Sequence, residues 1–281
     1  MRFGAHVSIA GGISAALERA RDLHIRVFQI FSRSPRGKGR NISEKEIKYF
    51  RQRCQELAFH DFYLHSPYYI NLASSNLKVW HYSISCLVED LKLTELLGAK
   101  YLVVHTGNHG GEGVEEGTKR VAKALRRIFS EGPSHASLLL ENTAGQGTAI
   151  GCRWEELASI IHSSGVEERL GTCVDTCHAF ACGYDIRTRE KVDETLERFD
   201  RIIGLARLKL LHGNDSKGAL GSRIDRHEDI GRGRIGLAGF QAVVNHPALD
   251  RLDMIIETPK MGSESDRRNL DILTGLVDQE K

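Results

Sequence analysis

Residues 100–141 read KYLVVHTGNHGGEGVEEGTKRVAKALRRIFSEGPSHASLLLE and contain one copy of the pattern that decides the fold. Two apolar runs, at residues 100–105 and 137–141, flank a stretch with helical spacing over residues 114–129. Near-continuous apolar runs of this length are typical of strands that are covered on both faces of a parallel sheet. The segment therefore predicts a strand, a helix and a second strand parallel to the first.

The same alternation extends along the whole chain. Apolar runs typical of strands also occur at residues 2–7, 25–31, 61–65, 171–175, 208–212 and 252–257. Helical spacing occurs at residues 13–22, 43–57, 75–97, 154–162, 189–204, 237–244 and 266–277, with a capping-box pattern from Ser43 to Glu46 and a typical helix end at Gly98. Eight strand–helix units favour a single α/β domain over residues 1–281, a closed (β/α)8 TIM barrel. An open doubly wound sheet is the alternative, but no Gly-x-Gly-x-x-Gly motif follows the first strand.

The composition is that of a soluble globular protein. The 281 residues are 41% hydrophobic and 27% charged, with a formal net charge of +2, which argues against disordered, collagen-like and disulfide-scaffold proteins. Apolar runs stay well below the length of a membrane span, and the first residues are not typical of a secretory signal. The six cysteines include no Cys-x-x-Cys pair, so we expect reduced thiols in a cytoplasmic protein. Cys173, Cys177 and Cys182 lie close in sequence, but their spacing fits no common zinc motif.

Six successive predicted strands end in a side chain that can bind a metal ion. These residues are His65, His105, Glu141, Asp175, His212 and Glu257. A single histidine or glutamate at a strand end is most often solvated or hydrogen-bonded, but six in succession are hard to explain in that way. The carboxyl ends of the strands form the mouth of a TIM barrel, where catalytic residues lie. We therefore predict a metal site at the C-terminal mouth.

Three further residues enlarge this set. They are His178, three residues after Asp175, and the pair Asp225 and His227 after the seventh strand. Nine ligands are too many for one zinc ion, which binds three or four protein groups. Three ions that share carboxylates fit the number better, and mixed imidazole and carboxylate ligands suit zinc or manganese. Because such clusters suit phosphate-ester hydrolysis, the residues predict metal-dependent cleavage of a phosphodiester or phosphomonoester.

Two basic loops and an aromatic segment follow strands at this end of the barrel. Residues 32–40 carry four positive charges and no acid, and Tyr68 and Tyr69 come soon after His65. Four arginines follow the seventh strand: Arg223, Arg226, Arg232 and Arg234. Such features are often only solvated surface or loop packing. A basic rim around a metal centre also fits a polyanion whose phosphate enters the mouth, with aromatic rings that wedge or stack against bases.

Motifs over almost the full chain resemble those of the endonuclease IV family, the zinc-dependent apurinic/apyrimidinic endonucleases. The matching segments are GAHVS (4–8), HSPYYINLA (65–73), LGAK (97–100), LENTAGQG (140–147), DTCHAFA (175–181), HGNDSK (212–217), GSRIDRH (221–227) and ETP (257–259). The resemblance implies a TIM barrel that holds three zinc ions at its mouth, with manganese as an alternative at one site.

The resemblance also implies how the nine ligands divide. The first ion would be held by His65, His105 and Glu141. Glu141 would bridge to a second ion, which Asp175, His212 and Glu257 would also hold. His178, Asp225 and His227 would hold the third. Glu141 would in addition be the catalytic residue that orients or deprotonates the attacking water.

The family cuts double-stranded DNA on the 5′ side of an abasic site in base excision repair. It leaves a 3′-hydroxyl and a 5′-deoxyribose phosphate and also removes 3′-blocking groups, the activity of the deoxyribonuclease IV (phage-T4-type) class. Arg36 and Tyr68 match the positions that fill the gap left by the flipped nucleotide, and Arg226 is a further expected DNA contact. We expect a cytoplasmic monomer that associates with the nucleoid when it acts.

Three positions depart from the family pattern. Gly37-Lys38-Gly39-Arg40 replaces the usual Gln and Trp after Arg36, which would make DNA binding by this loop more purely electrostatic. Thr106 replaces a proline, and Gly213 replaces an aliphatic residue, which would loosen the end of the seventh strand. His109 is either an extra polar group at the mouth or a surface residue.

Two other functions compete with this prediction. A sugar or sugar-phosphate isomerase can use a similar metal-bearing barrel, because fold alone does not define chemistry. Such an enzyme needs one or two ions and has no evident use for a third set of ligands. A catalytically silent DNA-damage binder would be expected to lack one or more ligands, whereas this chain has all nine.

Overall fold

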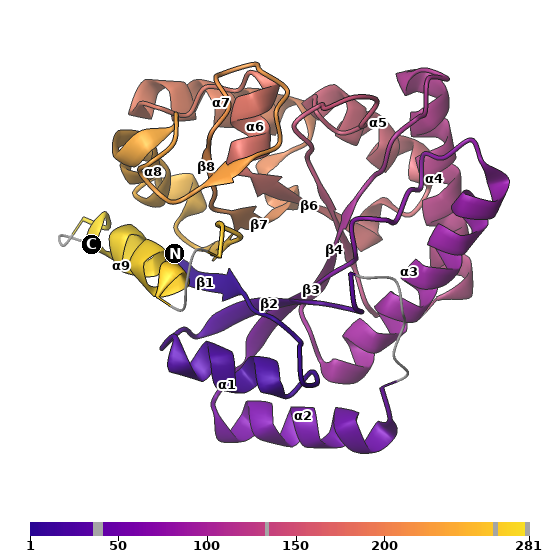
Figure 1. Cartoon of the computed structure of the whole chain (residues 1–281). Helices are drawn as coiled ribbons and strands as arrows, with labels where there is room; N and C mark the ends of the chain where they lie inside the picture. The colour runs from indigo at the N-terminus through magenta and orange to yellow at the C-terminus, as the bar shows by residue number, and fades with distance from the viewer. Residues whose placement is uncertain (36–41, 133–134, 261–263, 279–281) are drawn as a thin grey trace.

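The computed structural model describes residues 1–35, 42–132, 135–260 and 264–278. Eight parallel strands close into a barrel in the order β1-β10-β7-β6-β5-β4-β3-β2, which confirms the predicted fold. The barrel strands are β1 (Arg2–His6), β2 (Val27–Phe31), β3 (Asp61–His65), β4 (Tyr101–His105), β5 (Leu138–Glu141), β6 (Leu170–Asp175), β7 (Leu208–His212) and β10 (Asp253–Ile256). The helices around them are α1 (Ala15–Asp22), α2 (Glu44–Glu56), α3 (Leu77–Leu97), α4 (Val114–Glu131), α5 (Trp154–Ser164), α7 (Arg189–Ile202), α8 (Gly236–Val244) and α9 (Ser265–Gly275) (Figure 1).

Local sequence signals determine several helix ends. Ser43 caps α2, because its hydroxyl accepts a hydrogen bond from the Glu46 amide while the Glu46 carboxylate accepts one from the Ser43 amide. Gly98 ends α3 in the left-handed conformation, with φ 81°, which glycine adopts without steric cost. Both predicted helix ends are confirmed.

A layer of buried, mostly apolar side chains lies inside the barrel. It consists of Val27, Tyr63, Val103, Leu139, Cys173, Leu210 and Ile255, each 0% exposed. Side chains alternate along a strand, so the residue two positions further on points into the same interior. These next residues are Gln29, His65, His105, Glu141, Asp175, His212 and Glu257. The strand period therefore places six of the predicted ligands in one layer, directly above the apolar one.

Polar contacts close the barrel at the end opposite the mouth. Arg2 on β1 lies beside Asp253 on β10, and its Nε donates to the Asp253 carboxylate at 2.8 Å. The hydroxyl of Tyr63 donates to the other oxygen of Asp253 at 2.6 Å. The seam between the first and last barrel strands is thus joined by side chains as well as by the backbone.

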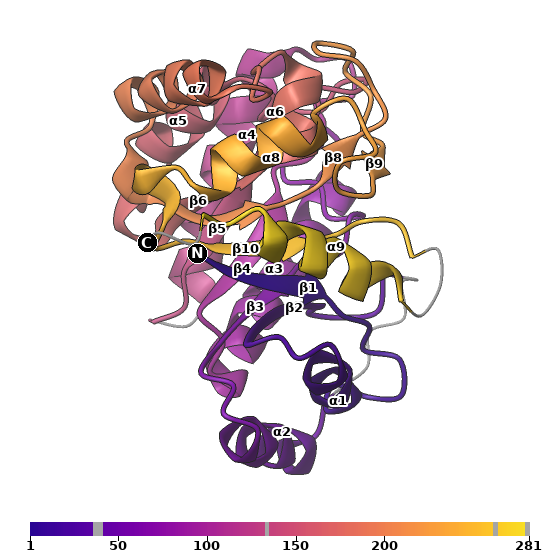
Figure 2. The same ribbon diagram turned by 90° about the vertical axis from the view of Figure 1, so that its left-hand side faces the viewer.

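Three short elements at the mouth were not predicted. Helix α6 (Thr176–Cys182) follows β6 directly, with Asp175 as its N-cap. Strands β8 (Asp215–Ser216) and β9 (His227–Glu228) pair antiparallel outside the barrel. In Figure 2, β1 runs from left to right, and β8 and β9 lie on the right-hand side, toward which it runs.

The expectation of reduced thiols is wrong for one pair of cysteines. Cys152, just before α5, and Cys182, the last residue of α6, form a disulfide with their Cα atoms 5.7 Å apart. The fold brings these positions together although 30 residues separate them in sequence. The remaining cysteines are free and buried: Cys54, Cys86, Cys173 and Cys177. Within the described ranges, no helix is both long and apolar enough to cross a membrane.

Candidate metal centre

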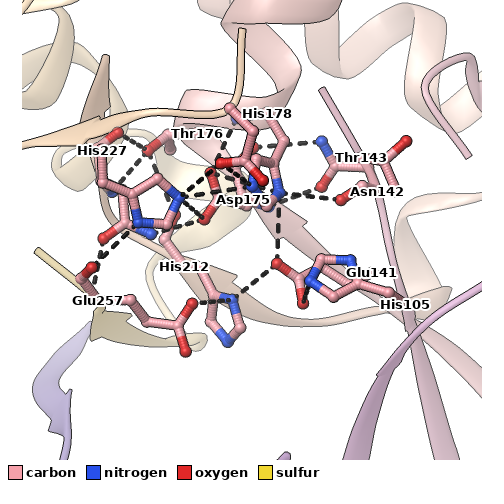
Figure 3. Close-up of polar contacts among 12 residues, drawn as sticks. His105, Glu141, Asn142, Thr143, Asp175, Thr176, His178, His212, His227 and Glu257 are labelled. Atoms are coloured by element: carbon pink, nitrogen blue, oxygen red, sulfur yellow. Dashed lines mark hydrogen bonds and ion pairs between the residues drawn. The ribbon is translucent and has the colours of Figure 1, made fainter. Parts of the chain in front are cut away.

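The nine predicted ligands lie together at the mouth of the barrel. The ligand atoms of Glu141, Asp175, His212 and Glu257 all lie within 4.8 Å of one another, and so do those of His178, Asp225 and His227. His65 groups with Glu141 and His212 in the same way. His105 Nε2 lies 3.4 Å from Glu141 Oε2. Figure 3 shows the His212 imidazole with Glu141 on one side and Glu257 on the other.

Glu141 lies between two of these groups. Its Oε2 is 2.9 Å from His65 Nε2, and its Oε1 is 3.1 Å from His212 Nδ1. The carboxylate is fully buried at the end of β5. Burial alone would raise its pKa, but the imidazoles of His105 and His212 outweigh burial and hold the pKa of Glu141 well below its usual range. The two oxygens therefore face two different sets of ligands as a carboxylate.

The third set of ligands comes from α6 and the β8–β9 hairpin. His178 Nε2 lies 3.1 Å from Asp225 Oδ1 and 3.4 Å from His227 Nε2. His227 Nε2 also lies 3.6 Å from the Asp175 carboxylate. Asp175 caps α6 by accepting a hydrogen bond from the His178 amide at 2.9 Å. This cap explains how a ligand three residues after the strand end reaches the same centre.

Hydrogen bonds to the backbone orient three of the imidazoles. Nδ1 contacts the Ser66 carbonyl at 2.6 Å in His65, the Asn142 carbonyl at 3.0 Å in His178 and the Glu257 carbonyl at 3.0 Å in His227. Because a carbonyl can only accept, these Nδ1 atoms carry hydrogens, and in the neutral rings the Nε2 atoms carry lone pairs. The Nε2 atoms of His178 and His227 face each other beside a carboxylate, so their lone pairs point into the same space. Lone pairs arranged in this way can coordinate a divalent cation.

Neighbouring carboxylates raise the pKa values of two imidazoles among the candidate ligands. Burial opposes the charged form of His178, but the carboxylates of Asp175 and Asp225 raise its pKa well above the usual value. Burial likewise opposes a charged His212, and Cys173, Glu257 and Glu141 outweigh it and raise the pKa of His212 well above the usual value. Ions that bind these nitrogens must therefore displace protons.

Two polar residues that support the ligands were not predicted. The amide of Gln29 is fully buried; its oxygen lies 3.0 Å from His212 Nε2, and its nitrogen lies 2.7 Å from Glu257 Oε1. His6 Nδ1 contacts the same oxygen of Glu257 at 2.7 Å. A signal for Gln29 was present in the sequence, because it is the one amide in the apolar run 25–31 and lies two positions after the inward-facing Val27.

Two asparagines immobilise the ligand Asp175. Asn142 accepts a hydrogen bond from the Asp175 amide at 2.7 Å. Asn214 donates to the Asp175 carboxylate at 2.6 Å and accepts from the Glu257 amide at 2.7 Å. Outer contacts of this kind orient ligands before an ion arrives.

Asp215 holds the turn that follows β9. Its fully buried carboxylate accepts hydrogen bonds of 2.8 to 3.2 Å from five backbone amides, those of Ser216, Gly231, Gly233, Ile235 and Gly236. A Cβ at Gly233 would lie 2.4 Å from the carboxylate, so glycine is required there. The turn presents Arg232 and Arg234 to solvent.

The basic rim is smaller than the sequence suggests. Arg33 donates to the carboxylates of Asp90, at 2.8 Å, and Glu89, at 3.2 Å, so its charge is already paired within the protein. Arg36, with Gly37 to Arg40, lies outside the described residues. The four arginines after β7 are exposed, and none forms an ion pair with another described residue: Arg223, Arg226, Arg232 and Arg234. These four remain available for an anionic partner.

Tyr68 lies on the opposite part of the rim. Its side chain is 71% exposed, and its ring lies edge-on to that of Tyr69 with 6.3 Å between centroids. A cavity of about 350 Å³ extends from Tyr68 to the ligands His105 and Asp225. The mouth therefore offers an exposed aromatic ring and a cavity directly beside the candidate metal ligands.

Two of the three departures from the family pattern, Thr106 and Gly213, lie among the described residues, as does His109. Thr106 donates to the Ile150 carbonyl at 2.7 Å. His109 accepts from the amides of Gly111 and Gly113 at 3.2 and 2.9 Å, so it orders its own loop. Gly213 does not loosen β7, because its amide still donates to the Ile255 carbonyl at 2.9 Å. A Cβ at this position would lie 2.6 Å from Met254 Sδ, so Met254 takes the space of a larger residue.

The chain is similar to known proteins over almost its whole length. Residues 17–275 match the family model described as a xylose isomerase-like TIM barrel. A protein of Halothermothrix orenii named probable endonuclease 4 is 42% identical over 275 residues, 97% of this chain and 99% of its own. One of the same name from Chloroflexus aurantiacus is 45% identical over 280 residues and 98% of each chain.

Solved structures give the same relationship. Endonuclease IV from Thermus thermophilus superposes with a TM-score of 0.86 at 37% identity and covers 98% of both chains. A D-tagatose 3-epimerase-like protein superposes with a TM-score of 0.74 at 21% identity over 98% of this chain and 97% of its own. At that identity the second likeness shows only a shared fold.

Proposed function

This chain belongs to the endonuclease IV family, and on that premise we propose that it is a metal-dependent DNA-repair endonuclease. It hydrolyses the phosphodiester on the 5′ side of an abasic site in duplex DNA and leaves a 3′-hydroxyl and a 5′-deoxyribose phosphate. It also removes groups that block 3′ ends. The nine candidate ligands at the mouth would hold three zinc ions, or two with manganese at one site.

The observation that carries this proposal is the ligand layer itself. Five imidazoles and four carboxylates converge from six barrel strands, α6 and the β8–β9 hairpin, and Glu141 belongs to two of the groups. When bound, the ions would supply Lewis acidity that activates water and positive charge that offsets the phosphate oxygens.

The chain's own residues account for the remaining steps. Glu141, as a buried carboxylate, orients the attacking water by accepting a hydrogen bond from it. Arg226 and the neighbouring arginines bind backbone phosphates on one side of the mouth. Tyr68 fills the gap that the flipped abasic nucleotide leaves in the helix. The cavity between Tyr68 and His105 receives the sugar that lacks a base, which a normal nucleotide enters less easily.

Sugar epimerisation is the second candidate, because the barrel is shared with a D-tagatose 3-epimerase-like protein. The third ligand set and the unpaired arginines have no role in that reaction. Both have a role in binding and cutting a polyanion.

The test uses a labelled duplex that contains one tetrahydrofuran abasic analogue. This analogue cannot undergo β-elimination, so a cut must be hydrolytic. We expect one incision 5′ to the lesion, lost after chelation and restored by zinc or manganese. An intact strand after incubation with metal-loaded protein would refute the proposal, and epimerisation would be tested next.

A further inference from the structure

We propose that Gln29 is a positioning residue that selects the tautomer of His212 and orients Glu257, so that both present the correct atoms to a metal ion. The inference rests on the proposed metal centre. The side chain of Gln29 is fully buried in the same layer as the candidate ligands.

His212 is oriented differently from three other histidines of the centre. In His65, His178 and His227 the Nδ1 atom contacts a backbone carbonyl. In His212, Nε2 faces the Gln29 amide at 3.0 Å, while Nδ1 faces Glu141 Oε1 at 3.1 Å and Glu257 Oε2 at 3.4 Å. His212 must therefore bind an ion through Nδ1, which requires that Nε2 carry the hydrogen.

The contact with Glu257 determines which end of the Gln29 amide faces His212. A carboxylate can only accept, so the Gln29 group 2.7 Å from Glu257 Oε1 must be the NH2 group. The amide oxygen then faces His212 Nε2, and an oxygen can only accept from it. One amide thus keeps the hydrogen on His212 Nε2 and leaves the lone pair on Nδ1.

The same amide reaches across the barrel seam to two candidate ligands on its far side. Gln29 is on β2, His212 ends β7, and Glu257 follows β10. His6 on β1 contacts the same Glu257 oxygen at 2.7 Å, which leaves Oε2 directed at His212. An apolar side chain at position 29 would leave His212 without this acceptor and Glu257 without this donor.

The experiment compares Gln29→Met, which has similar size but no amide, with Val27→Ala. Val27 is fully buried two positions earlier on β2 and faces the same interior, so its truncation controls for a packing defect. In zinc-loaded, 15N-histidine-labelled protein, we expect a directly observed Nε2–H for His212, assigned by its absence from His212→Asn. Gln29→Glu keeps an acceptor and should retain that signal.

Metal affinity is the second readout, measured by competition with a chromogenic chelator. Loss of an outer hydrogen bond to a metal ligand typically weakens binding by about 10 to 100-fold. Gln29→Met should weaken the binding of one ion to this extent. The affinity for the ion held by His178, Asp225 and His227 should not change. Val27→Ala should leave all of the affinities unchanged.

Two results would overturn the inference. One is a His212 that carries its hydrogen on Nδ1 in the wild-type protein, which needs no variant to establish. The other is a Gln29→Met variant that keeps both the Nε2–H signal and wild-type affinity for every ion. Absence of incision by metal-loaded wild type would instead refute the proposed nuclease function, so the two failures are distinguishable.

Discussion

The disulfide between Cys152 and Cys182 predicts that stability depends on redox conditions. The bond joins the segment before α5 to the end of α6, and 30 residues separate the two cysteines. Closing a loop of this length in the unfolded chain contributes about 3.5 kcal/mol to the free energy of unfolding. With an unfolding entropy of about 2.1 cal/mol/K per residue, a chain of 281 residues should lose about 6 °C in Tm on reduction.

The assay is thermal unfolding of the chelated protein before and after treatment with a phosphine reductant. The matched control is the double variant Cys152→Ser, Cys182→Ser, whose Tm should be lower and insensitive to the reductant. Thiol titration in denaturant provides an independent check. We expect reaction at the four cysteines that are free in the fold, and at all six after reduction.

Six reactive thiols without reductant in air-purified protein would refute the disulfide. Four thiols together with a Tm that does not change on reduction would instead refute the stabilisation calculated from loop closure in the unfolded chain. Because His178 lies on α6, the reduced protein should also lose metal from the third ligand set faster than the oxidised protein does.

Three further predictions concern the metal centre. Glu141→Gln should lower the metal content per chain, measured by atomic emission, more than His105→Ala does, because Glu141 belongs to two ligand groups; equal losses would contradict this. Tyr68→Ala should weaken binding to an abasic duplex by about 5 to 150-fold, the equivalent of 1–3 kcal/mol of stacking, and leave Tm unchanged because the side chain is 71% exposed. In chelated protein the pKa values of His178 and His212 are raised above 6.5. Their contribution to the free energy of unfolding is therefore complete below pH 6.5 and is lost as pH rises through the folded-state pKa values. The urea midpoint should decrease as pH rises above 6.5, and a midpoint that increases steadily from pH 6 to 9 would contradict this direction.

The clustering of most candidate ligands at the mouth could be predicted, because strand geometry is visible in the sequence. Side chains of a barrel strand alternate between inward and outward positions, and the strand ends at the mouth. A histidine or acid at the inward-facing end of an apolar run therefore lies in the mouth of the barrel. His65, His105 and Glu141 follow this rule. Glu257 lies one residue beyond β10, and its side chain still points inward.

The supporting residues could not be predicted in the same way. The position of Gln29 inside an apolar run indicates a buried amide, but its partners His212 and Glu257 lie more than 180 positions further along the chain. The partners Cys152 and Cys182 become neighbours only after α5 and α6 pack. Arg33 reads as part of a solvated basic loop, because the acids that pair with it lie on α3, more than 50 residues away. Long-range polar pairing is a property of the folded chain that local patterns do not contain.

The seam between β1 and β10 has a consequence for the order of assembly during synthesis. Arg2 and Asp253 are 251 positions apart, so the edge of β1 stays unpaired until nearly the whole chain has been made. Pairing over such a separation is slow, and an open edge invites association with other chains. Glu257 is the last candidate ligand to leave the ribosome, and it reaches its place beside His6 only when the seam closes. A nascent chain can therefore carry eight of the nine candidate ligands and still lack the mouth that arranges them.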